Sequence, residues 1–553
     1  MSVSRDRIVL IWSVLLAVLV LAPLGLRGYV LSYDMVWVPD PDLARPDVWG
    51  LGTALPRAVP SDAWVAVLGS VLPAWLVQRV VLLVVLVVGA VGAARLVRDL
   101  PVGAALVAAT FWSWNPFVFE RLLIGHWPLL LGYAALPWLI AALRRDVVPW
   151  GTVVLCGVAL GLTPVGGLLA AVTVLVVARR RLVPLALTVL GSAPWIVAGL
   201  LHADAARTDR AGVGLFDLAS EGPLGSAWTA LTMGGIWNSL VAPGSRDSWL
   251  SAGLSLVLLA VALVGARRLA RSDRDLLVRL SVLALVGLVV AGAGRVVPGL
   301  LEALQEVPGG GLLRDGTRWL LLLAPWWAVT LAHGAAALVS RVADAGSRGI
   351  ALALCVALPV VALPDLAWGL GGRIDAVDYP TSWQQTRADV ATSEVRGDLL
   401  VLPYSSYRAP AWNGGRSVLD PAGRYFPRTT VVSDELRVSG RVVSGEDPRA
   451  AEVGSAVADR DVDALRDLGI GLVVTDASAE PATEPLGELV STHGTLTLST
   501  LGDAEPYASS TIDRVTMTAV WLVYLATVLA GLVLVVRGAV GGRRGAAGGA
   551  GRT

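Results

Sequence analysis

The sequence predicts an all-α polytopic membrane bundle that carries one small α/β domain outside the membrane. Hydrophobic residues make up 55% of the chain and charged residues only 16%, which is typical of a protein that crosses a bilayer repeatedly. About twelve apolar stretches follow one another, and arginines gather at alternate ends of these stretches. One long segment, residues 372–514, is polar and interrupts the series.

The transmembrane core is predicted to comprise residues 1–371. A spanning helix needs roughly 20 apolar residues, or fewer where it is short, and the candidate spans are 8–27, 79–97, 102–115, 127–143, 149–163, 165–178, 182–201, 249–266, 276–293, 318–338, 349–367 and 515–536. The stretch 149–178 has arginines at both ends and Thr163-Pro164 in its middle. Since one helix cannot have both ends on the same side, we predict a hairpin of two short helices that turns at Thr163–Gly167.

The arginine clusters fall on one side of the membrane if each stretch crosses it once. They are Arg5/Arg7, Arg95/Arg98, Arg144/Arg145, Arg179–Arg181, Arg267/Arg268/Arg271/Arg274, Arg341/Arg348 and Arg537/Arg543/Arg544. Arginine is retained on the cytoplasmic side, so both termini are predicted to be cytoplasmic. The absence of lysine and the bias toward Ala, Val, Leu, Gly and Arg indicate a bacterial plasma membrane protein.

Composition also limits the classes of binding partner that are expected. The net charge of +1 argues against nucleic acid, and membrane lipids are expected instead. Cys156 and Cys355 both lie in apolar runs, so we interpret them as small hydrophobic residues and not as a disulfide or metal pair.

The polar segment 372–514 is predicted to be an extracytoplasmic α/β domain. Strand-like runs appear at 398–403, 430–437 and 470–475, and a helical pattern covers 449–468. Residues 515–537 form the last transmembrane helix, and the Gly- and Arg-rich tail 538–553 is predicted to be disordered and cytoplasmic.

Asp34 is the first candidate for chemistry, because it follows the first span closely in the sequence Tyr33-Asp34-Met35-Val36-Trp37. We expect partial burial to raise its pKa and make it a better proton acceptor. Transfer of a sugar from a lipid-linked phosphate needs such a base, together with cations that hold the departing phosphate. The alternatives are that Asp34 caps an interfacial helix or pairs with Arg27. Trp37 is expected either to stack on a sugar or to anchor the chain at the interface.

A second concentration of polar and aromatic residues spans Trp112–Trp127. Asn115-Pro116 predicts a helix break, and the short helix that follows is expected to expose Glu120 and Arg121 at the outer surface. Ionisable residues at membrane depth are functional candidates. The alternative is a structural pair of Glu120 with Arg121 or His126. His126 alone does not predict a metal site, because none of the four histidines is spaced as a partner.

A third cluster, Arg314-Asp315-Gly316-Thr317-Arg318, precedes a span on the outer side. The positive-inside rule disfavours arginine there, so Arg314 and Arg318 imply a compensating anion: a phosphate, a lipid headgroup or Asp315 itself. No Walker loop, HExxH or CxxC pattern occurs, which argues against nucleotide-driven and zinc chemistry.

These segments together resemble a known family. The acid after the first span, the block 115–127, the motif Arg314–Trp319, and the stretches 401–404 and 465–474 are similar to the GT-C class of membrane glycosyltransferases. The nearest resemblance is to the membrane core of cell-wall arabinofuranosyltransferases and to YfhO-type multispan proteins. It implies a polyprenyl-phosphate sugar donor, an outer-face active site and Asp34 as the catalytic acid of the first loop. This chain has one carboxylate where many relatives have an acidic pair, so no cofactor is assigned and a divalent cation stays an alternative.

The hypothesis is therefore a membrane glycosyltransferase that moves a sugar from a polyprenyl-phosphate donor to a cell-envelope glycan or lipid acceptor. Asp34 would be the base, and Arg314 and Arg318, with Arg121, would hold the phosphate. Glu120 and His126 would orient the acceptor or the phosphate. The alternatives are a transporter or flippase of lipid-linked precursors, which should carry deep ionisable residues and internal repeats, and a non-catalytic membrane scaffold.

Overall fold

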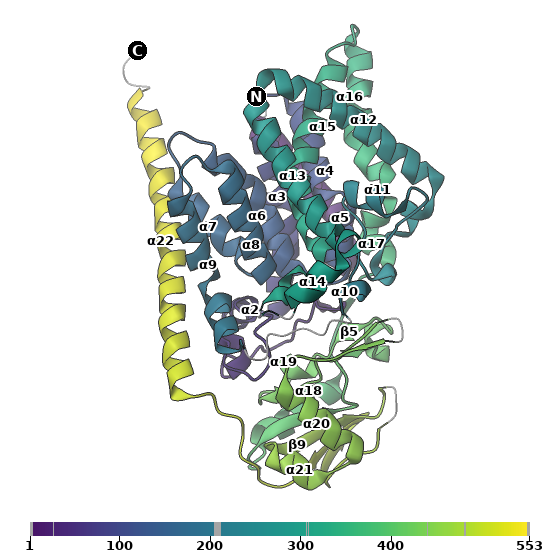
Figure 1. Cartoon of the computed structure of the whole chain (residues 1–553), viewed down its shortest axis with the longest axis vertical. Coiled ribbons are helices and arrows are strands. Elements are labelled where there is room, and N and C mark those ends of the chain that lie inside the picture. The colour runs from purple at the N-terminus through teal and green to yellow at the C-terminus, as the bar shows by residue number, and fades with distance from the viewer. Residues whose placement is uncertain are drawn as a thin grey trace.

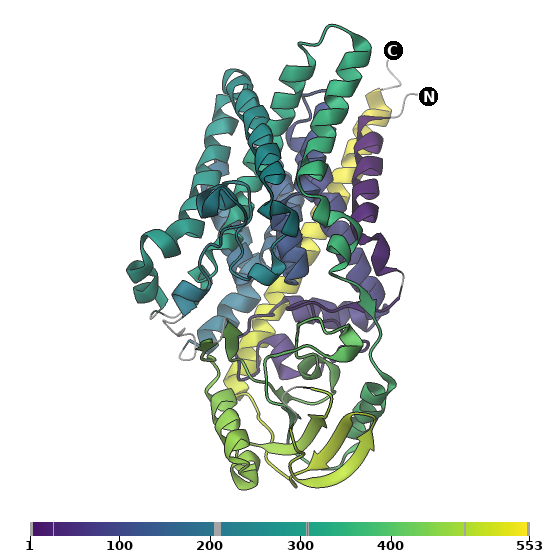
Figure 2. The same ribbon diagram turned by 90° about the vertical axis from the view of Figure 1, so that its right-hand side faces the viewer.

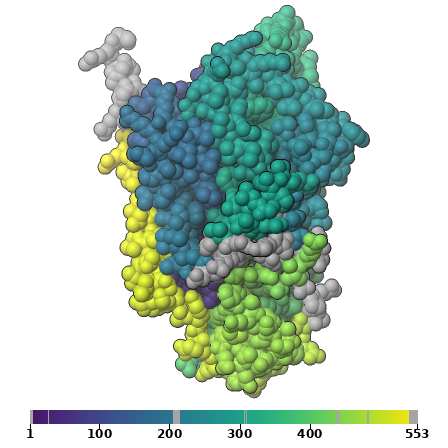
Figure 3. Space-filling model, in the orientation of Figure 1, coloured from purple at the N-terminus to yellow at the C-terminus, as the bar shows by residue number. Residues whose placement is uncertain are grey.

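The computed structural model describes residues 4–25, 27–203, 212–305, 307, 309–438, 441–479 and 483–549. A helical bundle forms most of the molecule, and an α/β domain lies at one end of it (Figure 1). Helix α1 (Arg5–Leu21) begins, and helix α22 (Thr511–Gly549) ends, at the opposite end of the bundle (Figure 2). In the space-filling view, α22 lines one side of the bundle (Figure 3).

The helices of the bundle coincide with the predicted spans. Among the described residues, nine helical segments are long and apolar enough to cross a membrane: Arg5–Leu24, Ala74–Leu96, Val102–Leu123, Leu182–Leu201, Trp249–Ser272, Arg274–Val296, Gly316–Val339, Ala345–Ala362 and Thr511–Val540. Three shorter apolar helices are α6 (Trp127–Leu143), α7 (Trp150–Leu160) and α8 (Pro164–Val177). The polytopic helical fold class is confirmed.

The bundle has a buried centre and an apolar surface. In the most apolar stretch of Val102–Leu123, 89% is buried. In the corresponding stretch of Ala345–Ala362, only 17% is buried. Large apolar side chains such as Leu15, Val289 and Leu354 are exposed on the outer helices. Such a continuous apolar exterior is stable only against lipid or another apolar partner.

The hairpin predicted within 149–178 is present. Helix α7 ends at Leu160 and α8 begins at Pro164, so the turn comes slightly earlier than expected. The Thr163 hydroxyl caps α8 by accepting a hydrogen bond from the Gly166 N–H at 3.0 Å.

The break predicted at Asn115-Pro116 is also present. Helix α4 (Val102–Ser113) stops there, and α5 (Pro116–Leu123) starts with the Asn115 side chain accepting a hydrogen bond from Val118 N–H at 3.1 Å. Every residue of α5 is buried. The expectation that α5 exposes Glu120 and Arg121 is wrong, because both side chains are buried by the segments packed around the helix.

The α/β domain contains a five-stranded sheet in the order β10-β11-β9-β3-β6. Its strands are β3 (Asp398–Leu402), β6 (Thr430–Val431), β9 (Ile470–Asp476), β10 (Glu488–His493) and β11 (Leu496–Thr500). β3 runs parallel to β9, and every residue of both strands is buried. Helices α20 (Pro448–Asp459) and α21 (Val462–Asp467) pack apolar residues against the sheet.

The loop that follows α1, residues 27–60 (the first loop), is joined to this domain by backbone hydrogen bonds. β1 (Tyr29–Val30) pairs antiparallel with β2 (Ala376–Val377). Tyr33 then exchanges two bonds with the hairpin of β4 (Tyr407–Arg408) and β5 (Val418–Leu419): Tyr33 N–H donates to Ser417 O at 2.7 Å, and Leu419 N–H donates to Tyr33 O at 2.8 Å. The α/β domain therefore fixes the backbone on either side of Asp34.

The C-terminal segment differs from the sequence prediction. Disorder was expected from residue 538, but α22 continues to Gly549. The segment contains no proline, the residue that breaks a helix, although its glycines disfavour one.

Candidate functional site

Asp34 is presented by a tight turn of the first loop. Met35 N–H donates to Ser32 O at 2.8 Å, and Tyr33 has a φ of +45°. This left-handed conformation is costly for a non-glycine residue, and the hydrogen bonds to the β4–β5 hairpin hold it in place.

The turn between α5 and α6 packs directly on the turn that carries Asp34. Ile124 O accepts a hydrogen bond from Asp34 N–H at 3.0 Å. Gly125 has a φ of +87°, and a Cβ added there would lie 2.1 Å from Met35 N. Only glycine fits at this position, and the next residue, His126, is thereby brought beside Asp34.

The Asp34 carboxylate receives hydrogen bonds from two sides. His126 Nε2 lies 3.1 Å from Asp34 Oδ2, and the Tyr407 hydroxyl of β4 donates to Oδ1. The Asp34 side chain is still 38% exposed, whereas that of His126 is 11% exposed. Asp34 therefore remains open to a ligand, and the expected alternative pair with Arg27 is not formed.

The neighbours of His126 determine its tautomer. Arg121 Nη1 lies 3.3 Å from His126 Nδ1, and because arginine can only donate, Nδ1 must accept. The proton of the neutral ring is then on Nε2, which donates to Asp34. His126 thus links the exposed carboxylate to a buried arginine.

Arg121 belongs to a buried charge network at the start of the Gly316–Val339 segment. Its Nη1 lies 3.2 Å from Asp315 Oδ2, and its Nη2 donates to Thr317 Oγ1. Arg318 Nε lies 2.9 Å from the same Asp315 oxygen. Asp315 is thus the anion that compensates Arg318, one of the alternatives that the sequence left open, and it compensates Arg121 as well.

Arg318 can still interact with a ligand. Its side chain is 36% exposed, and within the described part of the chain only its Nε forms a hydrogen bond, to Asp315. Its positive charge acts on both Asp34 and His126. A guanidinium of this kind suits a phosphate oxygen.

The pKa of Asp34 is lower than that of an ordinary aspartate. Burial is the largest single influence and raises this pKa, but the hydrogen bonds from His126 and from the Tyr407 hydroxyl, with the positive charge of Arg318, together lower it further. The expectation of a raised pKa is therefore wrong, because burial alone was considered. Asp34 is held as an ionised carboxylate.

The pKa values of the groups around Asp34 shift as well. Burial and the charge of Arg318 lower the pKa of His126, so its ring stays neutral. Burial and the charge of Asp34 hold the pKa of Tyr407 well above its ordinary value, so it remains a hydrogen-bond donor.

Two further arginines meet at one acid of the α/β domain. Arg57 Nη2 of the first loop lies 2.5 Å from Glu446 Oε2, and Arg314 Nη1 lies 3.9 Å from Glu446 Oε1. Arg314 also lies over the ring of Phe216, 4.3 Å from its centroid. Burial, followed by the charge of Arg57, lowers the pKa of Arg314 to about 10.

Glu120 does not face this site. It is 1% exposed, and its Oε1 accepts a hydrogen bond from Gly235 N–H at 3.2 Å. The same N–H donates to Glu221 Oε1 at 2.6 Å, and Glu221 pairs with Arg246 at 2.7 Å. Adjacent residues of a helix point in different directions, so Arg121 reaches Asp315 while Glu120 reaches the loop before α12 (Trp249–Ser272). The expectation that Glu120 lies at the mouth of a cavity is wrong.

Trp37 is likewise buried. It is 1% exposed and packs against Trp127 with the ring centroids 5.1 Å apart. A ring in this position cannot stack on a sugar, so the expected substrate contact of Trp37 is wrong. Trp37 instead belongs to the buried core on which the first loop is anchored.

The residues around Asp34 do not form a built metal site. Among the described residues, no group of three or more His, Cys, Asp or Glu side chains could hold an ion. Both carboxylate oxygens of Asp34 already accept hydrogen bonds from protein groups. These residues do not fit the divalent cation that was left as an alternative.

Three residues at the site were not singled out from the sequence: Tyr407, Arg57 and Glu446. Each lies in a polar loop or short strand, where its residue type is ordinary. Tyr407 is close in sequence to the noted stretch 401–404, but its contact with Asp34 depends on the pairing of the first loop with the β4–β5 hairpin.

Comparison with known proteins gives structural matches only. No protein-family model matches the chain, and no curated protein matches its sequence. The solved structure of the arabinofuranosyltransferase AftD from Mycobacteria is similar with a TM-score of 0.54 at 17% identity, over 91% of this chain and 40% of AftD. A mutant of AftD gives a TM-score of 0.55 at 17% identity, over 91% of this chain and 42% of that one.

A third similar structure is the archaeal oligosaccharyltransferase AglB from Archaeoglobus fulgidus, solved with an inhibitory peptide and a dolichol-phosphate. Its TM-score is 0.43 at 10% identity, over 85% of this chain and 69% of AglB. The chain spans about 40% of the length of AftD. It has the GT-C-like fold of membrane glycosyltransferases.

Proposed function

We propose that this protein is a membrane glycosyltransferase that transfers a sugar from a polyprenyl-phosphate donor to a cell-envelope glycan or lipid acceptor. The reaction takes place at the outer face of a bacterial plasma membrane, with both termini in the cytoplasm. One observation carries the proposal: the ionised, partly exposed Asp34 carboxylate feels the charge of the partly exposed Arg318 guanidinium, to which it is linked through His126, Arg121 and Asp315.

In the proposed reaction an acceptor hydroxyl attacks the anomeric carbon of the donor. The new bond joins the acceptor oxygen to the sugar, the bond from the sugar to the phosphate oxygen breaks, and the hydroxyl proton passes to Asp34. The low pKa of Asp34 makes it a weak base, so it takes the proton late, when positive charge has developed on the sugar. Its negative charge also stabilises that charge.

Arg318 is proposed to bind the phosphate that leaves, and Arg314 and Arg57 extend the cationic surface on which the phosphate lies. Arg121 acts through Asp315 and His126, because it is fully buried. His126 positions Asp34 by its hydrogen bond. Asp315 holds Arg318 in place.

The scaffold and transporter alternatives are less well supported. A scaffold has no need of an ionised acid and an exposed arginine in one place. A transporter of an anionic lipid would use ionisable residues along its path, but the buried Arg121 and Arg246 are paired with Asp315 and Glu221.

The test is an Asp34→Asn variant of the full chain, assayed for sugar transfer from a polyprenyl-phosphate donor. We expect activity to fall by at least about a hundredfold, the usual contribution of a positioned proton acceptor. Asp40→Asn is the matched control, because Asp40 is an exposed acid of the same loop and its replacement should leave activity unchanged. Full activity of Asp34→Asn at normal expression would show that Asp34 is not the proton acceptor and would contradict the proposed mechanism.

The acceptor class can be identified in cells. Depletion of the protein should lead to accumulation of an underglycosylated envelope intermediate, detected by profiling of lipid-linked glycans and cell wall. An unchanged glycan profile would favour the scaffold alternative.

A further inference from the structure

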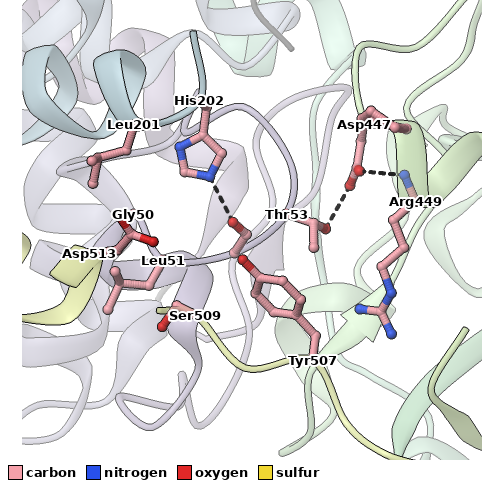
Figure 4. A pocket seen from close by; sticks show the side chains of 12 residues that line it. Gly50, Leu51, Thr53, Leu201, His202, Asp447, Arg449, Tyr507, Ser509 and Asp513 are labelled. Atoms are coloured by element: carbon pink, nitrogen blue, oxygen red, sulfur yellow. Dashed lines mark hydrogen bonds between the residues drawn. The ribbon is translucent and has the colours of Figure 1, made fainter. Parts of the chain in front are cut away.

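A cavity of about 310 Å³ lies between the bundle and the α/β domain, apart from Asp34 (Figure 4). Four segments line it: the first loop at Gly50–Thr53, the end of α9 (Leu182–Leu201) with His202, the start of α20 from Asp447, and residues 507–513 ahead of and within α22. This volume is at the lower end of the roughly 300–1,000 Å³ of small-molecule sites.

The polar walls of the cavity are held in place by hydrogen bonds. Asp447 is 5% exposed, and its two oxygens accept from Thr53 Oγ1 at 2.7 Å and from Arg449 N–H at 3.0 Å. His202 Nε2 lies 2.8 Å from Gly52 O. The loop and the domain are thus joined across the cavity, which gives it a defined shape (Figure 4).

Tyr507 supplies an aromatic surface on the same wall. Arg449 lies over its ring, 5.7 Å from the centroid, while the Arg449 guanidinium is anchored to Asp398 at 2.7 Å. Ser509 and Asp513 add a hydroxyl and a carboxylate nearby.

We propose that this cavity binds a sugar unit of the acceptor glycan, an inference that rests on the proposed function. A sugar ring offers hydroxyl groups to carboxylate and hydroxyl partners and an apolar C–H face to an aromatic ring. Asp447 and Asp513 accompany Arg449 in the lining, so the cavity suits a neutral, hydroxylated ligand better than a phosphate.

The cavity adjoins the proposed reaction site through one pair of neighbouring residues. Asp447 faces the cavity, while Glu446 contacts Arg57 and Arg314. The first loop follows the same path, with Thr53 bonded to Asp447 and Arg57 bonded to Glu446. A chain of several sugars can therefore place one unit in the cavity and present its end toward the arginines and Asp34.

Ser509→Trp tests this inference, because it fills the cavity at a side chain that forms no hydrogen bond with the residues that the structure describes. Ala508→Trp is the matched control, since Ala508 is exposed next to it and does not line the cavity. Full-length protein in nanodiscs is assayed with polyprenyl-phosphoryl arabinofuranose and arabinofuranose oligosaccharides of increasing length. Binding of the same oligosaccharides is followed by saturation-transfer NMR, which needs no turnover.

For Ser509→Trp we expect the KM for the longer oligosaccharides to rise about tenfold, which corresponds to the loss of one or two hydrogen bonds. The kcat, the KM for the donor and the KM for a monosaccharide acceptor should stay unchanged, and Ala508→Trp should resemble the wild type. Saturation transfer to the longer oligosaccharides should be lost in Ser509→Trp alone.

The outcomes separate the two proposals. If the wild type transfers sugar and Ser509→Trp matches it at every acceptor length, the assignment of the cavity is overturned. If no transfer occurs but Ser509→Trp abolishes oligosaccharide binding, the assignment stands and the proposed function fails. If the wild type binds no oligosaccharide, the assignment of the cavity is overturned.

Discussion

At the scale of single residues, the environment of Asp34 decides its chemistry more than its position in the sequence does. Burial alone would raise the pKa of Asp34, so that its carboxyl group would stay protonated up to a higher pH. His126, Tyr407 and Arg318 reverse that effect. Its ionised state therefore depends on residues from α5–α6, from the α/β domain and from the segment before α15 (Ala324–Val339).

Replacement of His126 by alanine should make Asp34 easier to protonate. The hydrogen bond from His126 lowers the pKa of Asp34, so its loss raises this pKa toward or above the ordinary value of about 3.9. Because a depressed pKa keeps the carboxylate ionised down to lower pH, the acid limb of the kcat/KM profile should move to higher pH. The measurement is kcat/KM for donor against pH.

His493→Ala is the control for that profile. His493 also lies beside an aspartate, 2.7 Å from Asp389, but on the surface of the α/β domain. Its removal should leave the acid limb in place. An acid limb at the wild-type position in His126→Ala would show that Asp34 is not the group that titrates.

At the scale of elements, two turns from distant parts of the chain create the site. The Ser32–Met35 turn and the α5–α6 turn meet backbone to backbone, and the absence of a side chain at residue 125 allows the contact. The precision of the site thus depends on how closely two loops approach.

Gly125→Ala should damage the site through this contact. A Cβ at 2.1 Å from Met35 N forces the turns apart, and a φ of +87° is strained for alanine. We expect destabilisation of about 1–3 kcal/mol and a fall in activity larger than that loss explains, because His126 and Asp34 separate. Thermal unfolding in detergent and a donor-transfer assay measure the two effects.

The matched control is Gly253→Ala in α12, where an added Cβ meets nothing within 4 Å. Alanine favours a helix over glycine, so this variant should be as stable as the wild type or slightly more so. If Gly125→Ala behaved in the same way, the close approach of the two turns would not matter for the site.

The sequence could predict where the helices begin and end but not how deeply each one is buried in the bundle. Apolar periodicity, arginine pairs and Asn115-Pro116 mark where helices begin, turn and break, because these signals are local. The burial of α5 could not be read, since it depends on the helices that pack around it. Trp37 illustrates the same limit, because the sequence around a tryptophan near an interface is the same whether its side chain contacts a ligand or packs in the core.

At the scale of the whole molecule, the candidate site unites segments that span almost the entire chain. Asp34, His126, Arg121, Asp315 and Arg318 could be found from sequence, because charged residues are conspicuous among apolar ones. Tyr407, Arg57 and Glu446 could not, because polar residues are ordinary in polar segments. Their roles arise when the α/β domain pairs with the first loop.

The same pairing places Asp34 on the side of the bundle that carries the α/β domain, so the orientation of the molecule in the membrane determines where the chemistry occurs. The arginine clusters lie toward the other end; for example, Arg144 pairs with Asp273 between α12 and α13 (Arg274–Val296). Since arginine is retained in the cytoplasm, the α/β domain is expected outside the cell.

Cysteine labelling in intact cells tests this orientation. With Cys156 and Cys355 replaced by alanine, Glu394→Cys on the α/β domain should react with a membrane-impermeant maleimide, because Glu394 is exposed and expected outside. Ser272→Cys, equally exposed at the end of α12, should react only after the membrane is permeabilised. The reverse pattern would place Asp34 in the cytoplasm, where the proposed transfer at the outer face could not take place.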